Sequence, residues 1–79
     1  MTDRSEPQDA SLLGKYRETV LAYEAISEEI ASLLEANGGG TVKMSDDDFM
    51  RYRDMARRRD MLYDMMKRLE VRLLGEDAN

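Results

Sequence analysis

Two stretches of heptad-spaced apolar residues, separated by Asn37-Gly38-Gly39-Gly40, constrain the fold of this chain more than any other feature. Apolar side chains that recur at alternating steps of three and four residues line one face of an α-helix that packs along a second helix. In the first stretch these positions are Leu13, Tyr16, Val20, Tyr23, Ile30 and Leu34, with Ser27 as a polar member. In the second stretch they are Tyr52, Met55, Arg59, Leu62, Met66, Leu69 and Leu73. The pattern predicts two long helices.

Capping residues mark where these helices begin and end. Asn37 and the glycines after it tolerate the left-handed backbone of a helix C-terminus, and Gly75 occupies the same place after the second stretch. Asp9 or Ser11 can cap the start of the first helix, and Ser45 the start of the second. We therefore predict a disordered tail over 1–9, a helical hairpin over 10–75 and a frayed end over 76–79. The hairpin consists of a helix over 10–36, a loop over 37–44 and a helix over 45–74.

Reversal of the chain through the loop brings the two apolar seams face to face. The predicted fold is all-α, an antiparallel two-helix hairpin that resembles a coiled coil. In this register Leu13 faces Leu69, Tyr16 faces Met66 and Tyr23 faces Arg59. One seam is a small core for an independent domain. We therefore expect a second copy of the chain to cover one flank, giving a homodimer with the form of a four-helix bundle.

Composition excludes several classes of function for this 79-residue chain. It contains neither Cys nor His, so it lacks thiol nucleophiles and the commonest general base and transition-metal ligand. We predict no cofactor, no metal site and no catalysis. No apolar run reaches the roughly 20 residues of a membrane span, and the N-terminal sequence does not resemble a signal peptide, so the expected location is the cytoplasm.

Charge is distributed unevenly between the two helices. The net charge of -5 comes from residues 1–40, whereas Phe49–Leu74 carries eight basic and four acidic residues. Arg59 is a charge on an apolar seam. It is expected either to extend outward to Glu24 while its stem packs, or to fix the register or the oligomeric state, or to contact the Tyr23 ring through a cation–π interaction.

Residues outside the seams, together with the charged Arg59 on the second seam, are the candidates for binding a partner. Unbranched methionine side chains suit surfaces that must adapt to a partner, and the arginines of the second helix can face an anionic ligand or a protein. The predicted partner-binding residues are Leu12, Ile26, Met50, Arg51, Arg58, Arg59, Met61 and Met65. A second set of off-seam residues, on the opposite flank, comprises Leu21, Ala31, Phe49, Ala56 and Tyr63.

These features favour a non-catalytic helical-hairpin interaction module, which self-associates and acts as an adaptor or regulator of a larger protein. One alternative is an acidic regulator that contacts nucleic acid or the transcription machinery through the arginines of the second helix. Against it, the sequence pI is about 4.6 and the arginines are spread around that helix. A second alternative is a small helical-bundle enzyme with an arginine-lined anion site.

Overall fold

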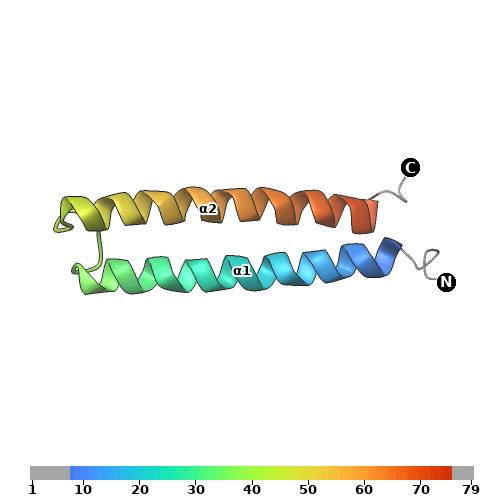
Figure 1. Cartoon of the computed structure of the whole chain (residues 1–79), viewed down its shortest axis with the longest axis horizontal. Helices are drawn as coiled ribbons and strands as arrows, with labels where there is room; N and C mark the ends of the chain where they lie inside the picture. Colours follow the sequence, from blue (N-terminus) through green and yellow to red (C-terminus); the bar gives the residue numbers. More distant parts are fainter. Residues whose placement is uncertain (1–7, 76–79) are drawn as a thin grey trace.

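The computed structural model describes residues 8–75, and these form two antiparallel helices joined by a loop (Figure 1). Helix α1 spans Gln8–Ala36, helix α2 spans Asp46–Glu70, and a final π-helical turn, η2, spans Val71–Gly75. The start of α1 and the end of η2 lie together at the end opposite the loop, which we call the open end. The predicted all-α hairpin is confirmed. The expectations for residues 1–7 and 76–79 lie outside the described residues.

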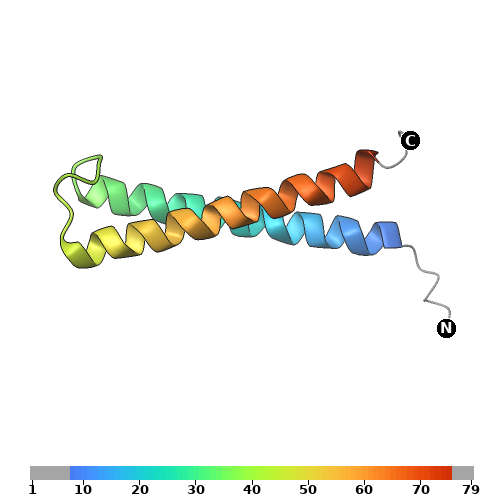
Figure 2. The same cartoon turned by 90° about the horizontal axis from the view of Figure 1, so that it is seen from above.

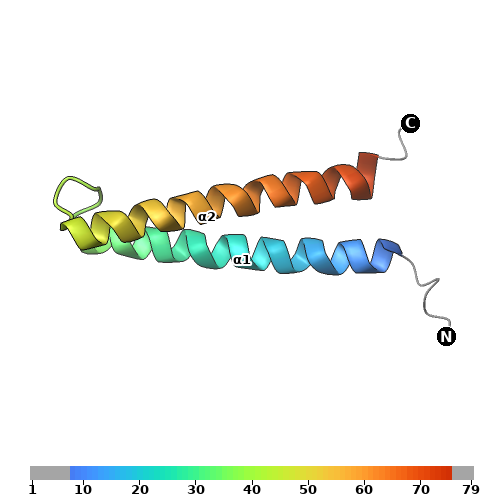
Figure 3. The same cartoon turned by 45° about the horizontal axis from the view of Figure 1, so that its top comes forward.

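The two helices cross rather than run strictly side by side (Figure 2). In an intermediate view they overlap at the loop end and separate toward the open end (Figure 3). A shallow crossing of this kind is typical of helices that pack through heptad seams. The hairpin therefore has two long flanks, one on each side of the seam, along which both helices contribute residues.

Helix α1 begins two residues before the expected start. Asp9 and Ser11 both lie within its first turn, so neither is the N-cap. Gly14 also lies in this part of α1, and a Cβ atom built there has no heavy atom within 4 Å.

The end of α1 is a Schellman motif. The Gly39 N–H donates to the Leu34 carbonyl oxygen at 2.8 Å, and the Gly38 N–H donates to the Glu35 carbonyl oxygen at 3.2 Å. Gly38 has φ of 82°, a left-handed conformation that glycine adopts without a steric penalty. The predicted helix end at Asn37-Gly38 is thus formed by local hydrogen bonds.

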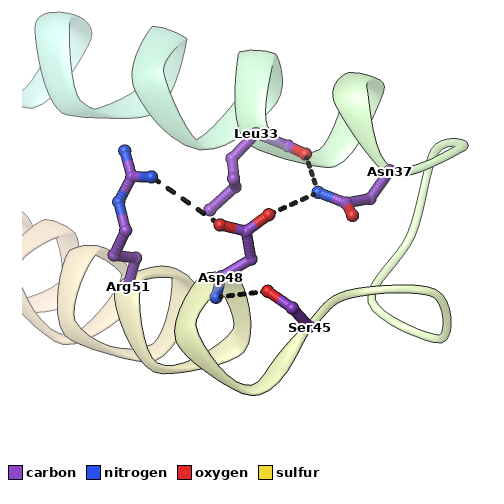
Figure 4. Close-up of polar contacts among 5 residues, drawn as sticks. All are labelled: Leu33, Asn37, Ser45, Asp48 and Arg51. Atoms are coloured by element: carbon purple, nitrogen blue, oxygen red, sulfur yellow. Dashed lines mark hydrogen bonds and ion pairs between the residues drawn. The ribbon is translucent and has the colours of Figure 1, made fainter.

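Ser45 is the N-cap of α2, as predicted: its hydroxyl oxygen accepts a hydrogen bond from the Asp48 N–H at 3.1 Å (Figure 4). The Asp48 carboxylate points toward α1, where the Asn37 side-chain amide donates to it across 3.5 Å. The same amide donates to the Leu33 carbonyl oxygen at 2.9 Å, so Asn37 connects the end of α1 to the start of α2. Arg51 completes the group at 3.7 Å from Asp48.

On α1 the most buried stripe differs from the predicted one. Thr19, Ile26 and Leu33 are 7%, 6% and 9% exposed, whereas Leu13 is 41% exposed. The seam therefore follows Thr19, Ile26 and Leu33 together with Tyr16, Tyr23 and Ile30, and the predicted seam residues Leu13, Val20, Ser27 and Leu34 lie on its edge. The prediction was wrong by one helical position because α1 carries apolar residues on two adjacent stripes. Thr19 is accommodated in the seam because its hydroxyl donates to the Lys15 carbonyl oxygen at 2.7 Å.

The register between the helices differs from the prediction as well. Tyr16 contacts Glu70 rather than Met66, and Tyr23 contacts Tyr63 rather than Arg59. Each contact lies one helical turn further along α2 than expected. On α2 the predicted seam residues are all buried or half-buried, so the seam of this helix is the predicted one. The change of register is therefore accompanied by a rotation of α1 alone.

The core of the hairpin is small. Among the residues with described side chains, the buried hydrophobic ones are Ile26, Ile30, Leu33 and Leu69, and no side chain is less than 2% exposed. Large apolar side chains remain at the surface of both helices. The flanks therefore carry the exposed apolar surface that is available for an interaction.

Candidate interaction surfaces

The first candidate surface lies on the flank where the tyrosines of the two helices meet. We call it the tyrosine flank and define it by Leu13 and Val20 of α1 and Phe49, Ala56 and Tyr63 of α2. Heptad geometry places these residues next to the seam on the same side, and the Tyr23 and Tyr63 rings, 6.2 Å apart, connect the two helices there. Leu13, Phe49 and Tyr63 are 41%, 41% and 46% exposed. At the open end, Leu13 lines an apolar groove with Leu73 and Leu74.

A polar network crosses the open end of this flank. The Tyr16 hydroxyl donates to Glu70 Oε2 at 2.8 Å, and Lys67 Nζ donates to Glu70 Oε1 at 3.3 Å. Lys67 Nζ also lies 5.7 Å from the centre of the Tyr63 ring, within the range of a cation–π interaction. The network joins the start of α1 to the last turn of α2 and holds the Glu70 carboxylate between a hydroxyl and an ammonium group.

These contacts change the acidity of all three groups. The hydrogen bond from Tyr16, followed by that from Lys67, lowers the pKa of Glu70. The hydrogen bond to Glu70 raises the pKa of Tyr16, and the corresponding bond raises the pKa of Lys67. At neutral pH the network therefore contains a carboxylate, a neutral phenol and an ammonium ion.

The second candidate surface is the opposite flank, which we call the arginine flank. Arg51, Arg58, Met65 and Arg72 recur every seven residues and form one stripe of α2 and η2 on this side. Near the loop, Arg51 and Met55 line a groove with Ala25, Glu28, Glu29 and Ser32 of α1. Near the open end, Met65, Arg68 and Arg72 line another groove with Lys15, Glu18 and Thr19. Outside the seam, the α1 side chains that line these two grooves are small or charged.

The structure brings together half of the residues that the sequence suggested for partner binding. Arg51, Arg58, Met61 and Met65 are exposed and lie on or next to the arginine flank. Met50 is 57% exposed but lies on the back of α2, away from the seam.

Three of the suggested residues lie on the seam or at its edge, and of these the sequence had already placed Arg59 there. Ile26 is buried, so its assignment to a partner-binding flank was wrong: it packs inside the hairpin because the seam of α1 is rotated. Leu12 is half-buried at the edge of the same stripe. Arg59 is half-buried on the seam of α2.

Neither specific partner expected for Arg59 is in contact with it. Among the described residues the ion pairs are Arg51–Asp48 and Lys67–Glu70, so Arg59 does not pair with Glu24. The Tyr23 ring packs against Tyr63 rather than under a guanidinium group. The change of register explains this difference, because it moves Arg59 away from the position opposite Tyr23.

The five arginines of the 51–59 segment do not form one surface. Arg51 and Arg58 are on the arginine flank, Arg53 is on the side of the tyrosine flank, Arg57 is on the back of α2 and Arg59 is on the seam. A phosphate backbone needs a continuous basic stripe. The 51–59 segment of α2 therefore does not present such a stripe for the nucleic-acid alternative.

Residues 8–75 contain neither a cluster of metal ligands nor a helix suited to a membrane. In residues 8–75 no group of three or more acidic side chains is arranged to hold a metal ion. Neither helix has the combination of length and apolarity needed to cross a membrane.

Sequence reasoning missed the Tyr16–Glu70–Lys67 network and the cluster of Lys15, Arg68 and Arg72. The seven-residue spacing of Phe49, Ala56, Tyr63 and Glu70 was a usable signal for the network side of α2. The basic cluster had no comparable signal, because Lys15 comes from the other helix and meets the arginines only once the register is known.

Comparison with known proteins gives no match: neither a protein-family model, nor a curated protein, nor a solved structure is significantly similar to this chain.

Proposed function

We propose that this protein is a non-catalytic interaction module that self-associates through the tyrosine flank, forming a four-helix bundle from two hairpins, and that it serves a larger protein partner. The observation that supports the proposal is that both helices carry apolar residues beyond the seam and carry them on the same side. Helix α1 extends its seam with Leu13, Val20 and Leu34, and helix α2 extends its seam with Phe49, Ala56 and Tyr63. Both extensions are on the same flank.

A two-stranded coiled coil needs only a narrow seam on each helix, whereas helices in a bundle carry a third apolar stripe that faces another layer. The extra stripe of α2 lies against the seam of α1, where Tyr63 packs on Tyr23. On the same side, Leu13 of the extra stripe of α1 lines a groove with Leu73 and Leu74. A second copy placed over this flank would bury side chains that are now about 40% or more exposed, including Leu13, Phe49 and Tyr63. That burial would supply the apolar area that a core of this size lacks.

The test compares two leucines of the same helix. Leu13→Glu places a charge on the tyrosine flank. Leu21→Glu places the same charge on the back of α1, because the rotated seam turns the 65% exposed Leu21 away from the flank to which the sequence pattern assigned it. We expect Leu13→Glu to shift the protein to a monomer in light scattering coupled to size exclusion, and Leu21→Glu to leave the dimer intact. Circular dichroism of both variants controls for loss of helix. A dimer that survives Leu13→Glu and is lost with Leu21→Glu would contradict the proposed face.

The arginine flank gives little support to the two alternative functions, a small enzyme and a nucleic-acid regulator. An enzyme needs convergent reactive groups in a cavity that excludes water, whereas the grooves of this flank are open. The basic residues there are accompanied by Glu18, Glu28 and Glu29 of α1. Mixed charge over an open apolar groove is more suitable for recognition of a protein than for catalysis or for binding a nucleic acid.

A further inference from the structure

The open end of the arginine flank concentrates positive charge in a protein that is otherwise acidic. Lys15 of α1 lines two adjoining grooves together with Arg72, and one of these grooves also contains Arg68. All three basic residues are exposed. Glu18 is the acidic residue in the same grooves, so the local charge is positive, whereas the whole chain has a net charge of -5.

The floor between these charges is apolar. It is formed by Met65, Leu69 and the half-buried Leu12. The Thr19 hydroxyl beneath it already donates its hydrogen bond to the Lys15 carbonyl oxygen. Met65 is 46% exposed, and its flexible thioether can adapt to the shape of a partner. A ligand that fits this site therefore needs an apolar side for the floor and at least two negative charges for the rim.

We propose that this groove binds an acidic amphipathic helix of a protein partner. The groove lies between two helices and runs along them from Ser11 to Glu18, which corresponds to about 10 Å, or two turns of a helix. A helix laid along such a groove presents apolar residues at spacings of three and four to the floor and acidic residues beside them to the basic rim. The inference rests on the proposed role as an interaction module, but it does not require self-association.

Charge and shape favour a protein helix over other anions. A nucleic acid would be repelled by the net negative charge of the chain and by the six acidic residues of α1, and it would leave the apolar floor unused. An inorganic anion would use the rim alone. The acidic helix is the ligand that satisfies both the rim and the floor.

The experiment uses the full chain and a labelled synthetic helix of three heptads with leucine at the seam positions and glutamate beside them. A twin peptide with lysine in place of glutamate serves as the probe control. We expect fluorescence anisotropy at low salt to show binding of the acidic peptide and not of its twin, with affinity falling as salt is added. Binding of both peptides alike, or of neither, would overturn the proposal, as would tighter binding of a single-stranded oligonucleotide.

Two pairs of substitutions with equal change in net charge locate the site. Arg68→Glu with Arg72→Glu should weaken binding of the acidic peptide by about tenfold or more, because attraction is replaced by repulsion at the rim. Arg53→Glu with Arg57→Glu, on other sides of α2, should change it by less than about twofold. Lys15→Glu, on α1, should weaken binding in the same way and provides a second variant in which the last turn of α2 is unchanged.

The oligomeric state of the same variants separates the two proposals. Loss of peptide binding in the Arg68 and Arg72 variant without change in its dimer would support the groove and leave self-association standing. Peptide binding by a protein that is monomeric at all concentrations would refute self-association and retain the groove. Equal weakening by the control pair would refute the groove alone.

Discussion

Truncation of Ile26 tests the arrangement of the core, because the sequence pattern and the structure place this residue differently. Ile26 is 6% exposed in the seam, although the heptad pattern of α1 put it on a flank. Ile26→Ala removes three buried carbon groups, each worth about 0.8 kcal/mol of transfer free energy, and a remaining cavity adds to the cost. We expect the free energy of unfolding to fall by about 3 kcal/mol, a large part of the stability of a domain of this size.

Urea denaturation followed by circular dichroism measures this loss. With a slope of about 1 to 1.5 kcal/mol per molar urea, the midpoint should decrease by about 2 to 3 M. Leu21→Ala is the matched control on the same helix: Leu21 is 65% exposed, so its truncation should change stability by less than about 0.5 kcal/mol. Both variants and the wild type are compared at one protein concentration. A midpoint for Ile26→Ala within error of the wild type would refute the assignment of the seam.

Three further substitutions test individual features of the hairpin. Gly14→Ala should raise the free energy of unfolding by up to about 1 kcal/mol, because the site is open and alanine is the better helix former; a loss of stability would reveal close packing at Gly14. Gly38→Ala should lower it by about 1 kcal/mol or more in urea melts, since a side chain at φ of 82° is strained, and Gly38→Asn should recover part of that loss. Glu70→Gln should flatten the acid limb of the stability curve: the lowered pKa of Glu70 implies a contribution that is present above the usual carboxyl pKa of about 4.3 and is lost as the pH falls through the lowered value. An acid limb that is unchanged in Glu70→Gln would show that the contact with Tyr16 does not contribute to stability.

Local signals made much of the fold predictable. The Asn37-Gly38 end of α1 and the Ser45 cap of α2 depend on residues next to each other in the chain, and both form as expected. The seam of α2 was also predictable, because its apolar residues occupy one stripe and its flanks are mostly charged.

The seam of α1 was not predictable in the same way. Val20 and Leu34 are at least as apolar as Thr19, so the sequence alone favours the wrong stripe by one position. The structure prefers Thr19 because Ile26 and Leu33 belong to its stripe, whereas Ser27 belongs to the other, and because the Thr19 hydroxyl finds a backbone acceptor.

The contacts between the helices depend on this rotation, so the sequence pattern did not predict them. The hydrogen bond between Tyr16 and Glu70 and the pairing of Tyr23 with Tyr63 arise from a register one turn away from the predicted one. The π-helical turn at Val71–Gly75 carries no marker in its sequence that distinguishes it from a regular helix end. The candidate surfaces were predictable only in part for the same reason. The sequence could assign Arg58, Met61 and Met65 to an exposed face of α2, but it could not show that Lys15 of α1 lies beside that face.

Sedimentation equilibrium of the wild-type protein tests whether two hairpins associate through the tyrosine flank. A core limited to residues such as Ile26, Ile30 and Leu33 together with apolar stripes on one flank predicts a particle of twice the 9.1 kDa chain mass. Dilution should reveal dissociation that is coupled to loss of helix, because the dimer supplies part of the stability of each hairpin. A mass of 9.1 kDa at every concentration, with the helices intact, would show that the hairpin is stable as a monomer and would refute self-association.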